Sequence, residues 1–156
     1  MIKKSFFCKI MMKGEKYMKK YINLAFLYAI LAMIGGIFYR EFTKFNNFTG
    51  ETTLAVVHLH LFVLGTVVFL LIAIFIHITD LGKQKTFNYF FKLYNIGLPF
   101  MTIMFLVRGI TQVLAIDLSS SASHAIPGIA GISHIIMGIA IVLLFISLRK
   151  SISTNH

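Results

Sequence analysis

An all-α integral membrane protein with four transmembrane helices is the fold that this sequence predicts. Of its 156 residues, 58% are hydrophobic, and the mean hydropathy of +0.84 is higher than that of a soluble domain. Four apolar stretches follow one another, and each is close to the roughly 20 residues that a helix needs to cross a bilayer. We therefore expect one membrane domain over residues 18–150 and a short tail at residues 151–156.

The first apolar run, at about residues 21–39, is predicted to be a retained helix. It ends in Phe38-Tyr39-Arg40-Glu41-Phe42, which lacks the small residues of a signal-peptide cleavage site. The later helices are expected at about residues 53–79, 89–116 and 126–148, the last with Pro127 in its first turn, where proline is favoured. The connections are short, which predicts an up-down-up-down four-helix bundle of antiparallel neighbours.

The basic residues predict how these helices are oriented. Lysines crowd the region before the first run, and more basic residues occupy the second loop and the tail, whereas residues 117–125 contain neither Lys nor Arg. Basic residues favour the cytoplasmic side, so both termini are expected to be cytoplasmic in a bacterial cell membrane. This distribution also favours the lipid bilayer, and not nucleic acid, as the partner of a chain with a net charge of +10.

Residues 1–17 differ from the rest and are interpreted as a basic leader. Lys13-Gly14-Glu15-Lys16 can be encoded by AAA-GGA-GAA-AAA, which contains a purine-rich ribosome-binding sequence a short spacer before Met18. We therefore expect translation of the native chain to start at Met18. An intact mass that includes residues 1–17 would contradict this expectation.

Polar residues on all four helices are predicted to lie in the outer half of the membrane. A rise of 1.5 Å per residue puts most of them about 6–12 Å from the outer helix ends. Ionisable side chains are costly in hydrocarbon and often mark a functional site. The set comprises Arg40, His58, His60, Arg108, Gln112 and His134.

Arg108 has no acidic residue in any of the four runs with which to pair. Its guanidinium stays charged, so its counter-ion is either a loop acid that folds inward or a bound anion. A haem propionate, a quinone-type oxygen or a small inorganic anion would serve. Alternatively, the side chain extends to the interface or bonds to helix carbonyls. The absence of acids from the runs also argues against a proton pump.

The histidines are spaced for more than one partner. Residues two apart on a helix point about 200° apart, so His58 and His60 are not expected to chelate one metal ion from a regular helix. His134 shares a face with Gly131 and Gly138, and His58 shares one with Gly65. Small residues beside a histidine leave room for a flat ligand or permit close helix packing.

Haem b between the second and fourth helices fits this pattern, because two histidines with nearby arginines form a reasonable haem environment. Such a protein would transfer electrons or sense redox state or gases. The expected site contains His58 or His60 together with His134 as iron ligands, Arg108 and Arg40 as partners of the propionates, and Gln112 in support.

Two other classes of function use the same residues. One is the binding or transport of a small anion or a metal ion, with His58, His60 and His134 as metal ligands. The other is a structural subunit of a homo-oligomer or larger membrane complex, in which interhelical hydrogen bonds are worth about 0.6–2 kcal/mol each. The sequence has no Gly-rich phosphate loop, no paired carboxylates in the runs and no Cys-x-x-Cys, so it predicts no enzyme on its own.

Five segments carry a resemblance to a known family: Tyr28-Ala29-Ile30-Leu31-Ala32-Met33, Phe38-Tyr39-Arg40-Glu41-Phe42, Thr53-Leu54-Ala55-Val56-Val57-His58-Leu59-His60, Val107-Arg108-Gly109-Ile110-Thr111-Gln112 and Gly128-Ile129-Ala130-Gly131-Ile132. From Met18 to about Lys150 the chain is similar to small four-helix bacterial membrane proteins known only as a domain of unknown function. The resemblance implies a fold and a membrane location, but no activity.

A local resemblance concerns the second run. The segment His58-Leu59-His60-Leu61-Phe62-Val63-Leu64-Gly65 resembles the His-x-His helix of haem-copper oxidase catalytic subunits and their nitric-oxide-related relatives. In those proteins the two histidines face opposite sides and serve different haems. This chain has far fewer helices and lacks the copper-binding histidines, so reduction of oxygen or nitric oxide is not expected of it alone.

Overall fold

The computed structural model describes the backbone of residues 2–153 and the side chains of residues 18–153, and this part of the chain is helical without strands. The second membrane run is divided into α2 (Leu54–His60), the π-helix η1 (Leu61–Val67) and α3 (Val68–Ile78), which together are called the second span. The remaining elements are α1 (Ile2–Phe45), the short 3-10 helix η2 (Leu81–Lys83), α4 (Lys85–Val113) and α5 (Ser120–Ser153).

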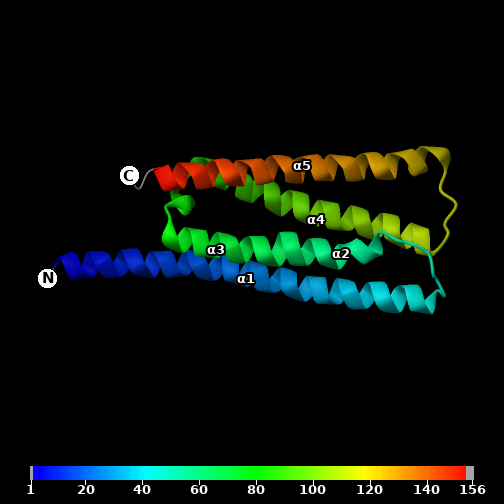
Figure 1. The fold of residues 1–156 in the computed structure, drawn as a ribbon, viewed down its shortest axis with the longest axis horizontal. Coiled ribbons are helices and arrows are strands. Elements are labelled where there is room, and N and C mark those ends of the chain that lie inside the picture. The colour runs from blue at the N-terminus through cyan, green and yellow to red at the C-terminus, as the bar shows by residue number, and fades with distance from the viewer. Residues whose placement is uncertain (1, 154–156) are drawn as a thin grey trace.

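Four helical segments are long and apolar enough to cross a membrane, which confirms the predicted class of fold. They cover Met18–Phe45, Leu54–Ile78, Lys85–Val113 and Ser120–Ser153. The segments lie alongside one another, with the start of α1 and the end of α5 at the same end of the molecule (Figure 1). The opposite end, where α2 begins, is called the distal end.

The helices extend beyond several expected boundaries: α1 continues to Phe45, α4 begins at Lys85 and α5 ends at Ser153. Two further differences have a local cause. The helix α5 begins at Ser120 and not near residue 126, because Ser119 caps it: its Oγ accepts the Ala122 N–H at 3.4 Å and its carbonyl accepts the Ser123 N–H at 3.0 Å. Pro127 therefore lies inside α5. The helix α4 ends at Val113 and not near residue 116, because Ala115 adopts a left-handed φ of 46°.

The four spans form an open row and do not enclose a common interior. The helix α1 packs along the second span, the second span also contacts α4, and α4 packs along α5 (Figure 1). Across the described residues, α1 and α5 make no extended contact with each other. Side chains on different spans therefore meet at pairwise interfaces, and polar residues at one depth do not necessarily meet.

Close contacts between spans depend on glycine. A methyl group added at Gly65 would lie 2.5 Å from Tyr28 of α1, and one added at Gly109 would lie 2.7 Å from the backbone nitrogen of Leu54. Helices in membranes associate through this kind of close packing at small residues. Aromatic rings support the contacts: Phe69 stacks on Tyr28 at 5.6 Å and meets Tyr94 edge-on at 5.7 Å.

Candidate functional site

A π-helix follows directly after the two histidines of the second span. His60 is the last residue of α2, and Leu61–Val67 form the π-helix. Such segments are rare and often occur at functional sites. The Leu64 carbonyl in this segment accepts a hydrogen bond from the Tyr94 hydroxyl of α4 at 2.7 Å. A buried side chain of a neighbouring span thus holds the segment beside His58 and His60.

His60 has a defined tautomer when its ring is neutral. Its Nδ1 lies 2.8 Å from the carbonyl oxygen of Val56, one turn earlier on the same helix. A carbonyl can only accept, so Nδ1 carries a proton and donates, and the neutral tautomer has its lone pair on Nε2. The ring meets Phe105 of α4 edge-on, with 4.7 Å between ring centroids.

His134 on α5 repeats this arrangement. Its Nδ1 donates to the carbonyl oxygen of Ala130 at 2.8 Å, and its ring meets the same Phe105 at 5.5 Å. The residue is exposed, and a methyl group added at Gly131 or Gly138 would meet nothing within 4 Å. The glycines beside His134 therefore border open space. His60, Phe105 and His134 are called the Phe105 cluster.

The Phe105 cluster presents two imidazoles prepared to bind through Nε2. Histidines that bind metals nearly always donate their other N–H to a carbonyl or carboxylate, which fixes the tautomer and raises the basicity of the ligating nitrogen. His60 and His134 both do so. Groups of three or more His, Cys, Asp or Glu that could hold a metal ion are absent from the described residues.

His58 lies on the other side of the second span, against α1. A methyl group added at Gly36 would be 3.7 Å from the His58 ring. The Nδ1 of His58 is buried without a hydrogen-bond partner, whereas Nε2 is not among the enclosed atoms. Enclosing an N–H without a partner is costly, so the proton is favoured on Nε2. The Nε2 of His58 is therefore a hydrogen-bond donor, whereas His60 and His134 donate from Nδ1.

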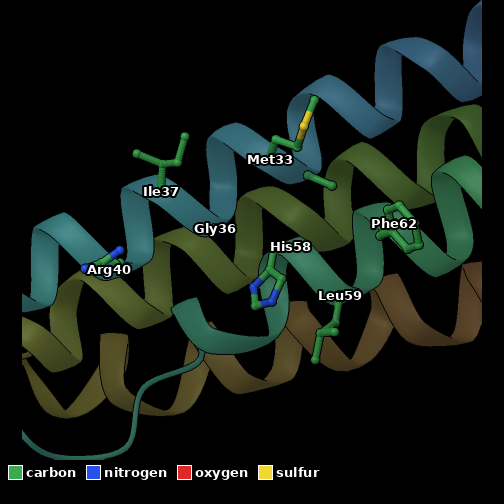
Figure 2. Close-up of a pocket in the computed structure, with 8 residues that line it drawn as sticks. Met33, Gly36, Ile37, Arg40, His58, Leu59 and Phe62 are labelled. Atoms are coloured by element: carbon green, nitrogen blue, oxygen red, sulfur yellow. The ribbon is translucent and has the colours of Figure 1, made fainter.

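The side chain of His58 opens into a groove of about 560 Å³. Figure 2 shows its lining residues on α1 and on the second span. Apart from His58 and Arg40, the groove is apolar, and it is called the His58 groove. It is lined by Ala32, Met33, Gly36, Ile37, Arg40, His58, Leu59 and Phe62.

The two arginines do not enter a shared interior. The Arg40 side chain is 80% exposed, and its Nε lies 3.9 Å from Oε1 of Glu41. Arg108 is exposed on α4, and no carboxylate among the described side chains lies within 4.0 Å of its guanidinium. The guanidinium of Arg108 therefore lies on the surface of α4 and not in a common interior.

Gln112 contacts the start of the second span. Its Oε1 accepts the Thr53 N–H at 2.9 Å, which satisfies one of the unpaired N–H groups of a helix start. Nearby, Thr53 Oγ1 donates to the Phe105 carbonyl at 3.0 Å and Thr52 Oγ1 to the Gly109 carbonyl at 3.1 Å. Sequence reasoning missed both threonines, although threonine before an apolar run is a typical helix-start signal.

The residues expected to form one layer thus fall into separate places. His60 and His134 both contact Phe105, which the sequence analysis did not place at the site, and His58 shares a groove with Arg40. Gly65 packs closely against Tyr28, which corresponds to the close helix packing that was one of the two interpretations of this glycine. The polar residues are separated because the spans form an open row, in which each face of the second span contacts a different helix.

Comparison with known proteins identifies a family and no activity. The chain belongs to the family described as protein of unknown function DUF2871, whose model matches residues 18–151. This match confirms the resemblance in the sequence to an uncharacterised family. No curated protein matches the chain, and no solved structure matches it.

Proposed function

We propose that this DUF2871 member is a multi-pass membrane protein that binds haem b through His60 and His134, for electron transfer or for redox or gas sensing. One observation carries the proposal: both imidazoles donate Nδ1–H to a carbonyl of their own helix and contact the same phenyl ring. The imidazoles of two spans therefore border the same phenyl ring, and each leaves Nε2 free of a hydrogen bond to its own helix. Axial histidines of haem need that tautomer.

The structure favours His60 over His58 as the ligand of the second span. His58 faces α1, and its buried Nδ1 has no acceptor that would hold the proton there. The haem site therefore combines one residue of the second span with His134 of α5, and His58 has a different role. This choice follows from the opposite directions of residues two apart on a helix.

The surroundings of the Phe105 cluster suit a flat ligand on an open face. Gly131 and Gly138 leave space beside His134, and a porphyrin would share the space around Phe105. Arg108 follows Phe105 by three residues on α4, has no carboxylate partner among the described side chains, and is a candidate partner for a propionate. Arg40 lies at the His58 groove and is not part of this proposed site.

We infer an up-down-up-down topology with both termini in the cytoplasm of a bacterial cell. The observation that supports it is the charge at the two ends of the row. The start of the first span, the η2 connection and the end of α5 carry Lys19, Lys20, Lys83, Lys85 and Lys150, whereas residues 114–119 contain no basic residue. Basic residues favour the cytoplasmic side.

Two alternatives have their own support. The exposed and unpaired Arg108 favours a small-anion site, and anion binding that disappears in Arg108→Ala would support that function. The hydrogen bonds of Gln112, Thr52 and Thr53 favour a structural subunit of a homo-oligomer or larger complex, which would fold and bind no ligand. Visible absorption by the purified protein would distinguish haem binding from both alternatives.

The test is a reduced-minus-oxidised visible spectrum of the detergent-purified protein, expressed with ample haem supply. We expect a b-type signal that is lost in His60→Ala and in His134→Ala. His58→Ala is the matched control, because it removes an imidazole two residues away on the same helix, and it should keep the signal. All variants are compared by helical content and gel filtration to show that they fold.

A colourless wild-type protein under these conditions would overturn the haem proposal. A signal that is lost in His58→Ala and kept in His60→Ala would overturn the assignment of the ligands. Loss of the signal in only one of His60→Ala and His134→Ala would contradict a site with two axial histidines.

A further inference from the structure

The His58 groove has one polar end and one apolar end. Along α1 it runs from Ala32 past Gly36 to Arg40. Twenty residues of helix separate Lys20 from Arg40, a length of about 30 Å, which matches the hydrocarbon core of a bilayer. Arg40 therefore lies at the membrane interface, and the rest of the groove runs from there into the hydrocarbon.

The second polar group lies one helical turn deeper. Gly36, which faces the His58 ring, precedes Arg40 by four residues, or about 6 Å along the axis. Because the proton is favoured on the nitrogen that is not enclosed, His58 can donate to an acceptor in the groove. The groove thus offers a cation at the interface and a hydrogen-bond donor about one turn below it.

We propose that the His58 groove binds one anionic phospholipid. The headgroup phosphate accepts hydrogen bonds from Arg40, and a glycerol ester carbonyl, a few bonds away, accepts one from His58. One acyl chain lies along Ala32 and Gly36, where the absence of large side chains leaves room. This lipid site is separate from the proposed haem site and does not depend on it.

Charge complementarity favours an anionic lipid over other apolar molecules. Among the described side chains, Glu41 is the carboxylate within reach of Arg40, and this exposed contact at 3.9 Å through Nε contributes little. A neutral quinone could accept a hydrogen bond from His58 but would not use Arg40. A lipid phosphate uses the guanidinium that is available at the mouth of the groove.

A second groove provides an internal comparison. It has a similar volume of about 550 Å³, lies between α1, the second span and α4, and has no ionisable side chain other than Tyr28 among its lining residues, which include Leu31, Ile34 and Thr102. An acyl chain could enter either groove. Selectivity for an anionic headgroup is expected only at the His58 groove.

The test is native mass spectrometry of the full chain, titrated in detergent with phosphatidylglycerol or phosphatidylcholine of the same acyl chains. We expect one phosphatidylglycerol to bind about five- to tenfold more tightly than phosphatidylcholine, as expected for a single arginine near a headgroup. Arg40→Gln should abolish this preference, and Gly36→Leu should reduce binding of both lipids. His58→Phe should weaken phosphatidylglycerol binding while keeping the preference.

Two controls test the location of the site. Lys44→Gln removes the same charge one turn further along α1 and should leave the preference unchanged. Leu31→Trp obstructs the second groove and should also leave it unchanged. Equal binding of the two lipids by the wild type, an unchanged preference in Arg40→Gln, or co-purification of a quinone that displaces the phospholipid would overturn the proposal.

The outcome is independent of the haem proposal because the titration uses protein without haem. If Gly36→Leu does not fold, Arg40→Gln still tests whether the His58 groove selects an anionic lipid. The Arg40 side chain is exposed, so its loss leaves the core unchanged. A normal haem spectrum in Arg40→Gln together with lost lipid preference would show two distinct sites.

Discussion

The two sides of the second span carry the same kind of residue in different chemical states. On the side of α4 and α5, His60 donates Nδ1–H to its own helix and presents a lone pair, and His134 across Phe105 does the same. On the side of α1, His58 encloses an unpaired Nδ1 and presents a donor to an apolar groove. The first side carries the proposed haem site and the second the proposed lipid site.

The difference shows that the position of a histidine around a helix decides what it can bind. A ring nitrogen that reaches a backbone carbonyl keeps its proton, and the opposite nitrogen becomes the ligand atom. A nitrogen that is enclosed without an acceptor gives up the proton to the other one. Two histidines separated by one residue therefore need not belong to one site.

The largest expected loss of stability comes from a substitution that pushes the second span away from α4. In Gly109→Ala the new methyl group would lie 2.5 Å from Leu54 Cγ and 2.7 Å from its backbone nitrogen, which cannot move without shifting α2. Overpacking of this kind costs about 1–3 kcal/mol, and we expect the upper half of that range. The loss of stability is measured by thermal unfolding in detergent, monitored by circular dichroism.

Gly65→Ala sharpens the comparison, because it disturbs the contact with α1. The new methyl group would lie 2.5 Å from Tyr28 Cβ and Cγ, and these atoms cannot move without shifting α1. We expect a loss of stability close to that in Gly109→Ala, and weaker lipid binding with haem binding retained. Gly128→Ala, where a methyl group meets nothing within 4 Å, is the control. Equal effects at positions 65, 109 and 128 would contradict the contacts described.

An intermediate effect is expected at Gln112. Gln112→Leu leaves the Thr53 N–H without its acceptor, and we expect a loss of about 1 kcal/mol, the typical net contribution of one hydrogen bond. Gln112→Glu keeps an acceptor oxygen and should restore most of the stability. If both variants lost their haem equally without loss of stability, Gln112 would act on the ligand and not on the helix start.

The sequence predicts the spans well but cannot predict how they are arranged in space. Apolar length determines whether a helix can cross a bilayer, so the four spans are visible in the sequence. Gly65 and Gly109 lie at tight contacts, whereas Gly131 and Gly138 face open space, and all four look alike in the sequence. The division of the polar residues into two sites depends on those contacts. The π-helix at Leu61–Val67 likewise has no sequence signal that we recognise.

A smaller loss of stability is expected when the hydrogen bond to the π-helix is removed. Tyr94→Phe removes the hydroxyl that donates to the Leu64 carbonyl at 2.7 Å, and interhelical hydrogen bonds in membranes average about 0.6 kcal/mol. Amide hydrogen exchange should become faster at residues 61–67 and remain unchanged in α5. Tyr89→Phe, at an exposed tyrosine on the same helix, controls for the loss of a hydroxyl. Unchanged exchange at residues 61–67 would show that this bond does not hold the π-helix.

The smallest effect on stability separates the haem side from the lipid side most clearly. Gly131 lies on the face of His134, and a methyl group there meets no atom within 4 Å, so Gly131→Leu should change the unfolding temperature of the haem-free protein very little. The larger side chain would, however, occupy the space beside His134 that the proposed haem requires. We expect the b-type signal to fall sharply while the preference for phosphatidylglycerol stays intact. A variant that keeps its full haem signal would place the ligand elsewhere, because a flat ring bound at His134 Nε2 cannot avoid a leucine one turn away on the same face.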